Sequence, residues 1–489
     1  MANDAANAKG MAIKIGVPHQ LIGGVWVKGE GPARTLLNPA DGCRLCEYGG
    51  ASARQVEQAL AAAKAAFLQW RATSALDRSR VLRRAAALLH AQRDDLAPVL
   101  TLEQGKPLAD ARIEWTNAIE VLEWYAEEGL RAYGRVIPAR QAGTRQLVVR
   151  EPIGPVAAFA PWNFPALTPM RKIAGALAAG CSCIIKPAEE TPSPTLAIAR
   201  ALIDAGLPAG VLNVVFGDAP AIAGQLIESP VIRKISFTGS TAVGKLLAAQ
   251  AASLAKPATL ELGGHAPVLI FPDADLDSAV ALAGSAKFRN GGQICVAPTR
   301  FIVHASVHDV FVERLAAFAS SLRIGPGLDP ATALGPLANA RRLAHAAALT
   351  EDARTKGARL VCGGNRLARD GYYWPATVLS DVPPTAQILH EEPFSPLAPC
   401  VRFDSTDEAI QLANDVPYGL AAYAFTQSLG IAHRVSDALE AGMVGINTCK
   451  VSLAELPFGG VKDSGYGTEG GIEGLAAYFT TKSISLAHH

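Results

Sequence analysis

The fold is decided by the stretch that opens with Val156-Ala-Ala-Phe-Ala160 and closes with Ile232-Arg-Lys-Ile-Ser-Phe-Thr238. Within it, short apolar runs alternate with longer segments whose apolar residues recur every three or four positions. The strands and helices predicted in this way cover residues 156–160, 171–179, 183–186, 194–205, 212–216, 219–227 and 232–238. Strands that alternate with helices form parallel sheets covered on both faces. The stretch therefore predicts an α/β fold.

The chain on either side of this stretch extends the same fold class. Two amphipathic helices precede it, over Arg54–Trp70 and Asp77–Arg93. After Glu261, apolar runs and helical segments alternate again, and these cover residues 266–270, 301–304, 307–322 and 398–403. This region predicts a second domain with its own sheet. Because ligands bind beyond the carboxyl ends of parallel strands and at domain interfaces, we expect the site between the two domains.

Composition excludes several classes of protein. The 489 residues carry 45 Lys+Arg against 44 Asp+Glu, a net charge of +1, so nothing indicates a nucleic-acid or membrane surface. No apolar run reaches the roughly 18 residues of a membrane span, and Met1–Gly10 lacks the apolar segment of a signal peptide. We expect a cytoplasmic protein. Eight cysteines are too few for a disulfide scaffold, and Cys43-x-x-Cys46 has no second pair, so no metal site is expected.

Two glycine motifs resemble nucleotide-binding signatures but lack essential parts. Gly239-Ser-Thr-Ala-Val-Gly244-Lys245 follows a predicted strand, yet the next residue is Leu246, where a P-loop needs a Ser or Thr oxygen for Mg²⁺. Gly465-Tyr-Gly-Thr-Glu-Gly470 does not follow an apolar strand, so we do not interpret it as a dinucleotide fingerprint. The Gly239 turn still opens a helix, whose N-terminus favours a phosphate. A cofactor that contains pyrophosphate is therefore plausible.

The residues that could carry chemistry stand at the ends of apolar runs. Cys295 follows two glycines, in a setting where a ligand can approach the backbone closely. Alone, Cys295 would be interpreted as a structural loop cysteine. Asn163, Glu261 and the run Glu391-Glu392-Pro-Phe394 are further polar groups at such positions.

The chain resembles the aldehyde dehydrogenase superfamily from about Leu21 to Leu486, through seven motifs that occur in order. They are Pro161-Trp-Asn-Phe-Pro165, Lys186-Pro-Ala-Glu189, Phe237-Thr-Gly-Ser240, Glu261-Leu-Gly-Gly264, Gly292-Gln-Ile-Cys295, Glu391-Glu-Pro-Phe394 and Pro457-Phe-Gly-Gly460. The resemblance implies a Rossmann-type cofactor domain, an α/β catalytic domain and a small β oligomerisation arm. It also implies a homodimer or homotetramer, built on the region 142–151 and a C-terminal strand over 478–485. The expected boundaries are 1–127 and 147–262 for the NAD-binding domain, 263–455 for the catalytic domain, and 128–146 and 456–489 for the arm and C-terminal segment.

The resemblance assigns catalytic roles to three residues. Cys295 would attack the aldehyde carbon, since cysteine is the strongest side-chain nucleophile. The side-chain amide of Asn163 and the Cys295 N–H would stabilise the oxyanion. After hydride leaves, Glu261 would activate the water that hydrolyses the thioester. We interpret His265, which follows the Glu261 motif, as structural rather than as a proton relay.

The resemblance also implies a set of cofactor contacts. They are Trp162, Lys186, Glu189, Gly239, Ser240, Gly244, Leu262, Glu392 and Phe394. Glu189 can accept a hydrogen bond from the ribose 2′-hydroxyl but repels a 2′-phosphate. We therefore expect NAD to be preferred, with NADP possible.

The substrate is expected to be an aldehyde with a carboxylate. Succinate-semialdehyde dehydrogenases hold that carboxylate with two arginines and a serine, which Arg171, Arg289 and Ser452 match. The α-ketoglutaric semialdehyde dehydrogenases resemble the chain through other segments and share a carboxylated substrate. Alternatively, the arginines form domain-closing salt bridges, or the chain is an inactive member that serves as a binding protein. Ala297 stands where some members carry a second, regulatory cysteine.

Overall fold

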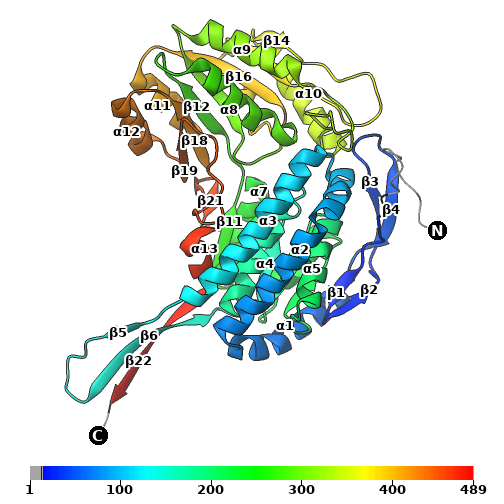
Figure 1. Cartoon of the computed structure of the whole chain (residues 1–489), viewed down its shortest axis with the longest axis vertical. Helices are drawn as coiled ribbons and strands as arrows, with labels where there is room; N and C mark the ends of the chain where they lie inside the picture. The colour runs from blue at the N-terminus through cyan, green and yellow to red at the C-terminus, as the bar shows by residue number, and fades with distance from the viewer. Residues whose placement is uncertain (1–12, 14, 488–489) are drawn as a thin grey trace.

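The structure is a computed structural model that describes residue 13 and residues 15–487. Residues 1–12, 14, 488 and 489, which belong to the expected cofactor and C-terminal segments, lie outside the described residues. Two parts, each a large sheet with its covering helices, lie one above the other along the long axis, and a β arm projects at the end where the C-terminus lies (Figure 1). This is the predicted architecture.

The first sheet has eight strands, of which the central five are parallel. In spatial order the strands are β2 (Val25–Val27), β1 (Gln20–Ile22), β9 (Leu212–Val214), β8 (Cys183–Lys186), β7 (Val156–Phe159), β10 (Lys234–Thr238), β11 (Ala258–Glu261) and β21 (Gly465–Tyr466). The false dinucleotide motif thus begins in an antiparallel edge strand, paired with β11.

Helices cover both faces of this sheet because its strands are apolar on both sides. Ala158 and Ile185 pack into one cluster, whereas Ala157 and Ile184 pack into the cluster on the opposite face. The first face is covered by α2 (Ala75–Gln104), α3 (Leu108–Glu128), α4 (Leu167–Ala179) and α5 (Pro192–Asp204). The second face is covered by α1 (Ala53–Ala72), α6 (Ala219–Glu228) and α7 (Thr241–Ser253).

Two predicted helices are longer than expected. α2 continues past Arg93 and through Pro98 to Gln104, and it ends where Gly105 adopts a φ of 96°. α4 begins at Leu167, so Arg171 lies in its second turn instead of opening it.

The second sheet has seven strands, parallel except for its first edge strand. In order these are β14 (Arg359–Cys362), β15 (Thr377–Ser380), β16 (Leu397–Phe403), β13 (Pro298–His304), β12 (Ala266–Ile270), β18 (Ala421–Phe425) and β19 (Met443–Ile446). Its helices are α8 (Leu276–Phe288), α9 (His308–Ser321), α10 (Ala340–Thr355), α11 (Thr406–Asn414) and α12 (Leu429–Ala438). They pack on it through three separate apolar clusters.

The arm is a three-stranded antiparallel sheet of β5 (Arg135–Ile137), β6 (Thr144–Pro152) and β22 (Phe479–Ala487). β22 pairs with β6 over nine residues, from Phe479 opposite Pro152 to Ala487 opposite Thr144. The expected boundary at residue 146 therefore cuts a continuous strand, and residues 147–152 belong to the arm. The reason is that β22, distant in sequence, supplies hydrogen-bond partners along the whole of β6.

The remaining elements are short. They are β3 (Ala33–Leu37), β4 (Arg44–Gly49), β17 (Tyr418–Gly419), β20 (Val461–Lys462), α13 (Gly471–Ala476) and the 3₁₀ turns η1 (Gly129–Arg131), η2 (Arg289–Gly292) and η3 (Gln387–Leu389). Within the described part of the chain, no helix has the length and apolar character needed to cross a membrane. No group of three or more His, Cys, Asp or Glu side chains in that same part could hold a metal ion.

The strand register brings four loops to one edge of the first sheet. Phe159 pairs with Lys186 on one side and with Phe237 on the other. Thr238, the next residue of β10, pairs with Glu261. The carboxyl ends of β8, β7, β10 and β11 therefore lie side by side, and the segments that leave them carry most of the predicted site residues.

Candidate functional site

The candidate nucleophile Cys295 lies in a loop directly after η2. Asn290, Gly291 and Gly292 adopt φ values of 49°, 62° and 70°, in the left-handed region that favours glycine. A side chain at Gly292 would collide with the carbonyl of Ser395, so this position requires glycine on steric grounds as well. The loop closely approaches the segment between β11 and β12, because a Cβ atom at Gly264 would lie 2.5 Å from the Cys295 carbonyl oxygen.

Asn163 lies on the loop after β7 and contacts the nucleophile loop directly. Its side chain is buried, and its Nδ2 donates to the carbonyl of Gln293 at 3.0 Å. An amide nitrogen has two hydrogens, so this contact leaves one for a second acceptor. The main-chain carbonyl of Asn163 in turn accepts from Lys106 Nζ at 2.8 Å and from Asn290 Nδ2 at 3.1 Å.

Glu261, the last residue of β11, is a buried carboxyl group without a hydrogen-bond partner. The residue is 2% exposed, and neither carboxyl oxygen has a partner among the described residues. Burial raises the pKa of Glu261 well above its usual value, and the charge of Glu469 raises it further. A carboxyl group in this state accepts a proton readily once it is ionised, as a general base must.

The charges of the site act on Cys295 as well. Burial, followed by the charge of Glu392, raises the pKa of the thiol to about 12. The charge of Arg171 opposes this shift, whereas that of Glu261 adds to it. Cys295 is thus within electrostatic reach of residues from both sheets.

Glu392 and Phe394 connect the second sheet to the glycines after β11. Glu392 Oε1 accepts from the Gly264 N–H at 3.0 Å, and a Cβ atom at Gly263 would lie 2.8 Å from Oε2. The rings of Phe394 and Trp162 meet edge to face, 5.6 Å apart. The Cys295 loop, the Asn163 loop, the glycines after β11 and the segment of Glu392 and Phe394 are therefore connected by direct contacts.

Lys186 and Glu189 form an ion pair at the end of β8. Lys186 Nζ lies 2.5 Å from Glu189 Oε1, and the Gly217 N–H donates to the same oxygen at 3.3 Å. The pair is partly open, with side chains 8% and 23% exposed. Glu189 Oε2 makes no hydrogen bond with the described residues, so a ligand hydroxyl can donate to it.

The glycine turn at Gly239 leads into α7 without a side-chain cap. Ser240, the N-cap residue, makes no side-chain hydrogen bond to the helix, so the first N–H groups are available to a phosphate. Side chains at Gly239 and Gly244 would collide with Phe237 and Leu262, respectively. Together with Lys186 and Glu189, this turn fits a dinucleotide such as NAD(P).

Lys245, the lysine of the P-loop-like motif, points elsewhere. Its Nζ lies 2.6 Å from Asp463 Oδ2, at the surface. It is engaged with a carboxylate rather than with the helix N-terminus.

Arg171 and Ser452 come together, as the predicted substrate contacts should. Arg171 Nη2 donates to Ser452 Oγ at 2.7 Å, and the guanidinium lies 4.1 Å from the centre of the Phe458 ring. Arg171 is 5% exposed, its Nε has no partner, and it forms no ion pair with a described residue. Arg289 is exposed and bonds to neither; its guanidinium lies 6.0 Å from the ring of Phe164, next to Asn163.

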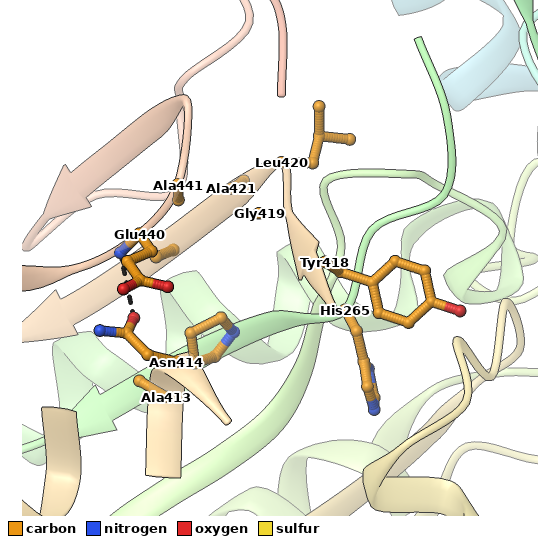
Figure 2. Close-up of a pocket in the computed structure, with 11 residues that line it drawn as sticks. His265, Ala413, Asn414, Tyr418, Gly419, Leu420, Ala421, Glu440 and Ala441 are labelled. Atoms are coloured by element: carbon orange, nitrogen blue, oxygen red, sulfur yellow. Dashed lines mark hydrogen bonds between the residues drawn. The ribbon is translucent and has the colours of Figure 1, made fainter. Parts of the chain in front are cut away.

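His265 is held by its neighbours, in agreement with the structural interpretation. Its Nδ1 lies 2.9 Å from Thr299 Oγ1, and its Nε2 lies 3.1 Å from the carbonyl oxygen of Ile388. Figure 2 shows it beside Tyr418 at a small hollow whose opposite side is formed by Asn414 and Glu440. Burial lowers the pKa of His265 well below its usual value, so the ring is neutral.

Sequence reasoning missed two buried ion pairs beside the site. Lys172 Nζ lies 2.6 Å from Glu469 Oε1, and Lys106 Nζ lies 2.5 Å from Glu114 Oε2. Charged residues are almost never fully buried unless they are paired, and each of these lysines has a carboxylate partner beside it. The sequence contained one weak signal, Gly105-Lys106-Pro107 at the end of a helix, where a lysine stands between two residues of restricted geometry.

The comparisons with known proteins agree with the motifs. The family described as "Aldehyde dehydrogenase family" matches residues 26–484. Succinate-semialdehyde dehydrogenase [NADP(+)] of Escherichia coli (strain K12) is 46% identical over 95% of the chain and 97% of its own length. The 3-sulfolactaldehyde dehydrogenase of Pseudomonas putida is 45% identical over 95% and 96%. The crystal structure of succinate-semialdehyde dehydrogenase from Burkholderia pseudomallei has a TM-score of 0.95, with 46% identity over 96% and 98% of the two chains.

We expect alkylation of Cys295 by iodoacetamide, without cofactor, to be slow at pH 7 and to rise steadily to pH 9. The reason is that the thiolate fraction grows about tenfold per pH unit below a raised pKa. Glu392→Gln should accelerate labelling at each pH, because it removes a charge that raises this pKa. The measurement is mass spectrometry of the Cys295 peptide.

Glu391→Gln is the matched control, since the carboxylate of Glu391 is exposed and does not contribute to the raised pKa of Cys295. A labelling rate that stays constant above pH 7 would contradict the raised pKa.

Proposed function

Because the chain belongs to the aldehyde dehydrogenase family, we propose that it oxidises a carboxylated aldehyde, foremost succinate semialdehyde, to the acid with NAD(P)⁺. The observation that carries this substrate class is the buried guanidinium of Arg171. It has no acidic partner among the described residues, yet it bonds to Ser452 and influences the pKa of Cys295. A buried cation without a counter-ion is costly, and a substrate carboxylate would compensate it.

The residues then act in sequence. The thiolate of Cys295 attacks the aldehyde carbon, and the new oxyanion accepts hydrogen bonds from the free hydrogen of Asn163 Nδ2 and from the Cys295 N–H. NAD(P)⁺, when bound, supplies a hydride acceptor. Glu261 takes a proton from the water that hydrolyses the thioester on Cys295. Its two unpartnered oxygens and its place at the carboxyl end of β11 support this role.

The proposed cofactor contacts follow the same edge of the sheet. Lys186 and Glu189 would hold the adenosine ribose, and the turn from Gly239 to Gly244 would hold the pyrophosphate. Glu392 would bind the nicotinamide ribose. We infer a preference for NAD, because Glu189 forms an ion pair with Lys186 and its carboxylate would repel a 2′-phosphate. The Escherichia coli relative, whose name specifies NADP(+), makes this inference one to test.

The alternatives are oxidation of another anionic aldehyde and a binding function without catalysis. α-Ketoglutaric semialdehyde also ends in a carboxylate, and the sulfonated substrate in the name of the Pseudomonas putida relative is likewise anionic. Arg171 and Ser452 suit each of them. An inactive binding protein would instead produce no NADH with any aldehyde, whereas an enzyme loses its NADH signal on Cys295→Ala.

We expect kcat/KM to be higher for succinate, glutarate or α-ketoglutaric semialdehyde than for butanal. Arg171→Met should lower the values for the semialdehydes about 10- to 100-fold more than the value for butanal, the weight of a charge-assisted hydrogen bond. Butanal should lose only the effect of Arg171 on the pKa values of Cys295 and Glu261. Ser452→Ala should act in the same direction but less strongly. Steady-state NADH formation measures each value. Equal losses for charged and uncharged aldehydes would mean that Arg171 does not bind the carboxylate.

We expect kcat/KM to be higher with NAD than with NADP, and Glu189→Ser to raise the NADP/NAD ratio about tenfold or more by removing like-charge repulsion and freeing Lys186. Glu190→Ser is the matched control, because its carboxylate pairs with Arg341 at 3.1 Å instead. A native enzyme that prefers NADP would refute the inference.

We also infer that the arm joins copies of the chain into a homodimer or homotetramer. Tyr133, Val136, Ile137 and Leu486 give the arm a group of exposed apolar side chains, and a partner that covers them would remove this apolar surface from water. Light scattering should give two or four times 51.0 kDa. A mass of one chain at micromolar concentration would contradict this assembly.

A further inference from the structure

Three charged side chains around the start of α3 reach the two catalytic loops. Lys106 stands just before the helix, Asp110 in its first turn and Glu114 one turn later, at intervals of four residues. Side chains at this spacing lie on one side of a helix. The side chains of Lys106 and Glu114 are completely buried, at 0% exposure each.

Lys106 contacts the main chain of the proposed oxyanion residue. Its Nζ donates to the Asn163 carbonyl at 2.8 Å, to Glu114 Oε2 at 2.5 Å, and lies 4.2 Å from the centre of the Phe164 ring. Asn290 Nδ2 donates to the same carbonyl at 3.1 Å. The peptide group after Asn163 is therefore held by a cation and by the nucleophile loop together.

Glu114 fixes the other end of the same loop. Its Oε1 accepts from the N–H groups of Ala166 and Leu167, at 2.7 Å and 3.3 Å. These groups open α4, whose N-cap position, Ala166, has no side chain able to cap the helix. Glu114 thus caps α4 from a different helix, with its charge at the positive end of the helix dipole.

Asp110, which lies between Lys106 and Glu114 in sequence, contacts the nucleophile loop. Its Oδ2 accepts from the Asn290 N–H at 3.1 Å, at the residue where the left-handed turn before Cys295 begins. One surface of α3 therefore contacts both the Asn163 loop and the Cys295 loop.

We propose that Lys106 and Glu114 are positioning residues that set the orientation of the Asn163 amide toward the oxyanion. The proposal rests on the role assigned to Asn163 above. A buried ion pair adds little stability over apolar side chains of the same size, so stability alone does not account for this pair. A displacement of about 1 Å in a catalytic group can cost about 100-fold in rate, so a role in precise placement would account for the pair.

The test is a double-mutant cycle on the rate of the NADH burst at saturating NAD. The variants are Asn163→Ala, the charge-neutral pair Lys106→Met/Glu114→Gln, and their combination. The neutral pair leaves no unpaired buried charge and retains the Glu114 Oε1 acceptor, so it protects folding. We expect it to slow the burst about 10- to 100-fold, with unchanged KM for NAD. In the Asn163→Ala background the same pair should slow the burst less than about twofold, because neighbouring groups that act through one another are not additive.

Lys234→Met is the control, since that buried lysine bonds to Thr259 at 2.6 Å and contacts neither loop. It should leave the burst rate unchanged in both backgrounds. Equal slowing by the neutral pair with and without Asn163 would overturn the positioning role. If Asn163→Ala alone leaves the burst rate unchanged, the role proposed for Asn163 fails, and that failure is recognisable without the pair.

Discussion

The hydrogen bond from Asn163 Nδ2 to the Gln293 carbonyl, 3.0 Å long, joins a loop of the first sheet to the loop that carries Cys295 in the second. Gln293 can accept it because its own side chain is anchored twice, by donation to the Asn290 carbonyl and by acceptance from the Ala338 N–H. The contact from Gly264 to Glu392 crosses between the sheets in the same way. Neither loop contains a complete site, so the chemistry depends on how the two sheets are held together.

Burial imposes a second constraint, which is electrostatic. The carboxyl group of Glu261 is buried, that of Glu392 and the thiol of Cys295 are partly buried, and desolvation raises the pKa of each. A buried nucleophile and base in their protonated forms are stable but unreactive. Arg171 lies within reach of both Glu261 and Cys295 and lowers both pKa values. The arginine proposed to bind the substrate carboxylate therefore also acts on the reacting groups.

Local patterns were sufficient to predict the fold and most of the proposed site. β8 and β12 begin and end at the predicted residues, because continuous apolar runs bounded by glycine, proline or charge define buried parallel strands. Short motifs identified Cys295, Asn163 and Glu261. The ion pair of Lys172 with Glu469 could not be predicted in this way, since the two residues are separated by 297 positions and no periodic pattern connects them. The domain boundary at residue 146 was misplaced because β6 continues to Pro152, paired with β22 from the end of the chain.

The residues proposed to select the cofactor form a small local group. The Lys186–Glu189 pair is local, four residues from end to end, and the Gly217 N–H that supports it belongs to the next strand connection. A 2′-phosphate must displace the Glu189 carboxylate from Lys186, whereas a 2′-hydroxyl can donate to that carboxylate and leave the pair intact. The proposed preference for NAD therefore rests on this one ion pair, whose carboxylate can be exchanged without disturbing a strand. The relative named for NADP(+) makes the cofactor preference of this chain a quantity to be measured.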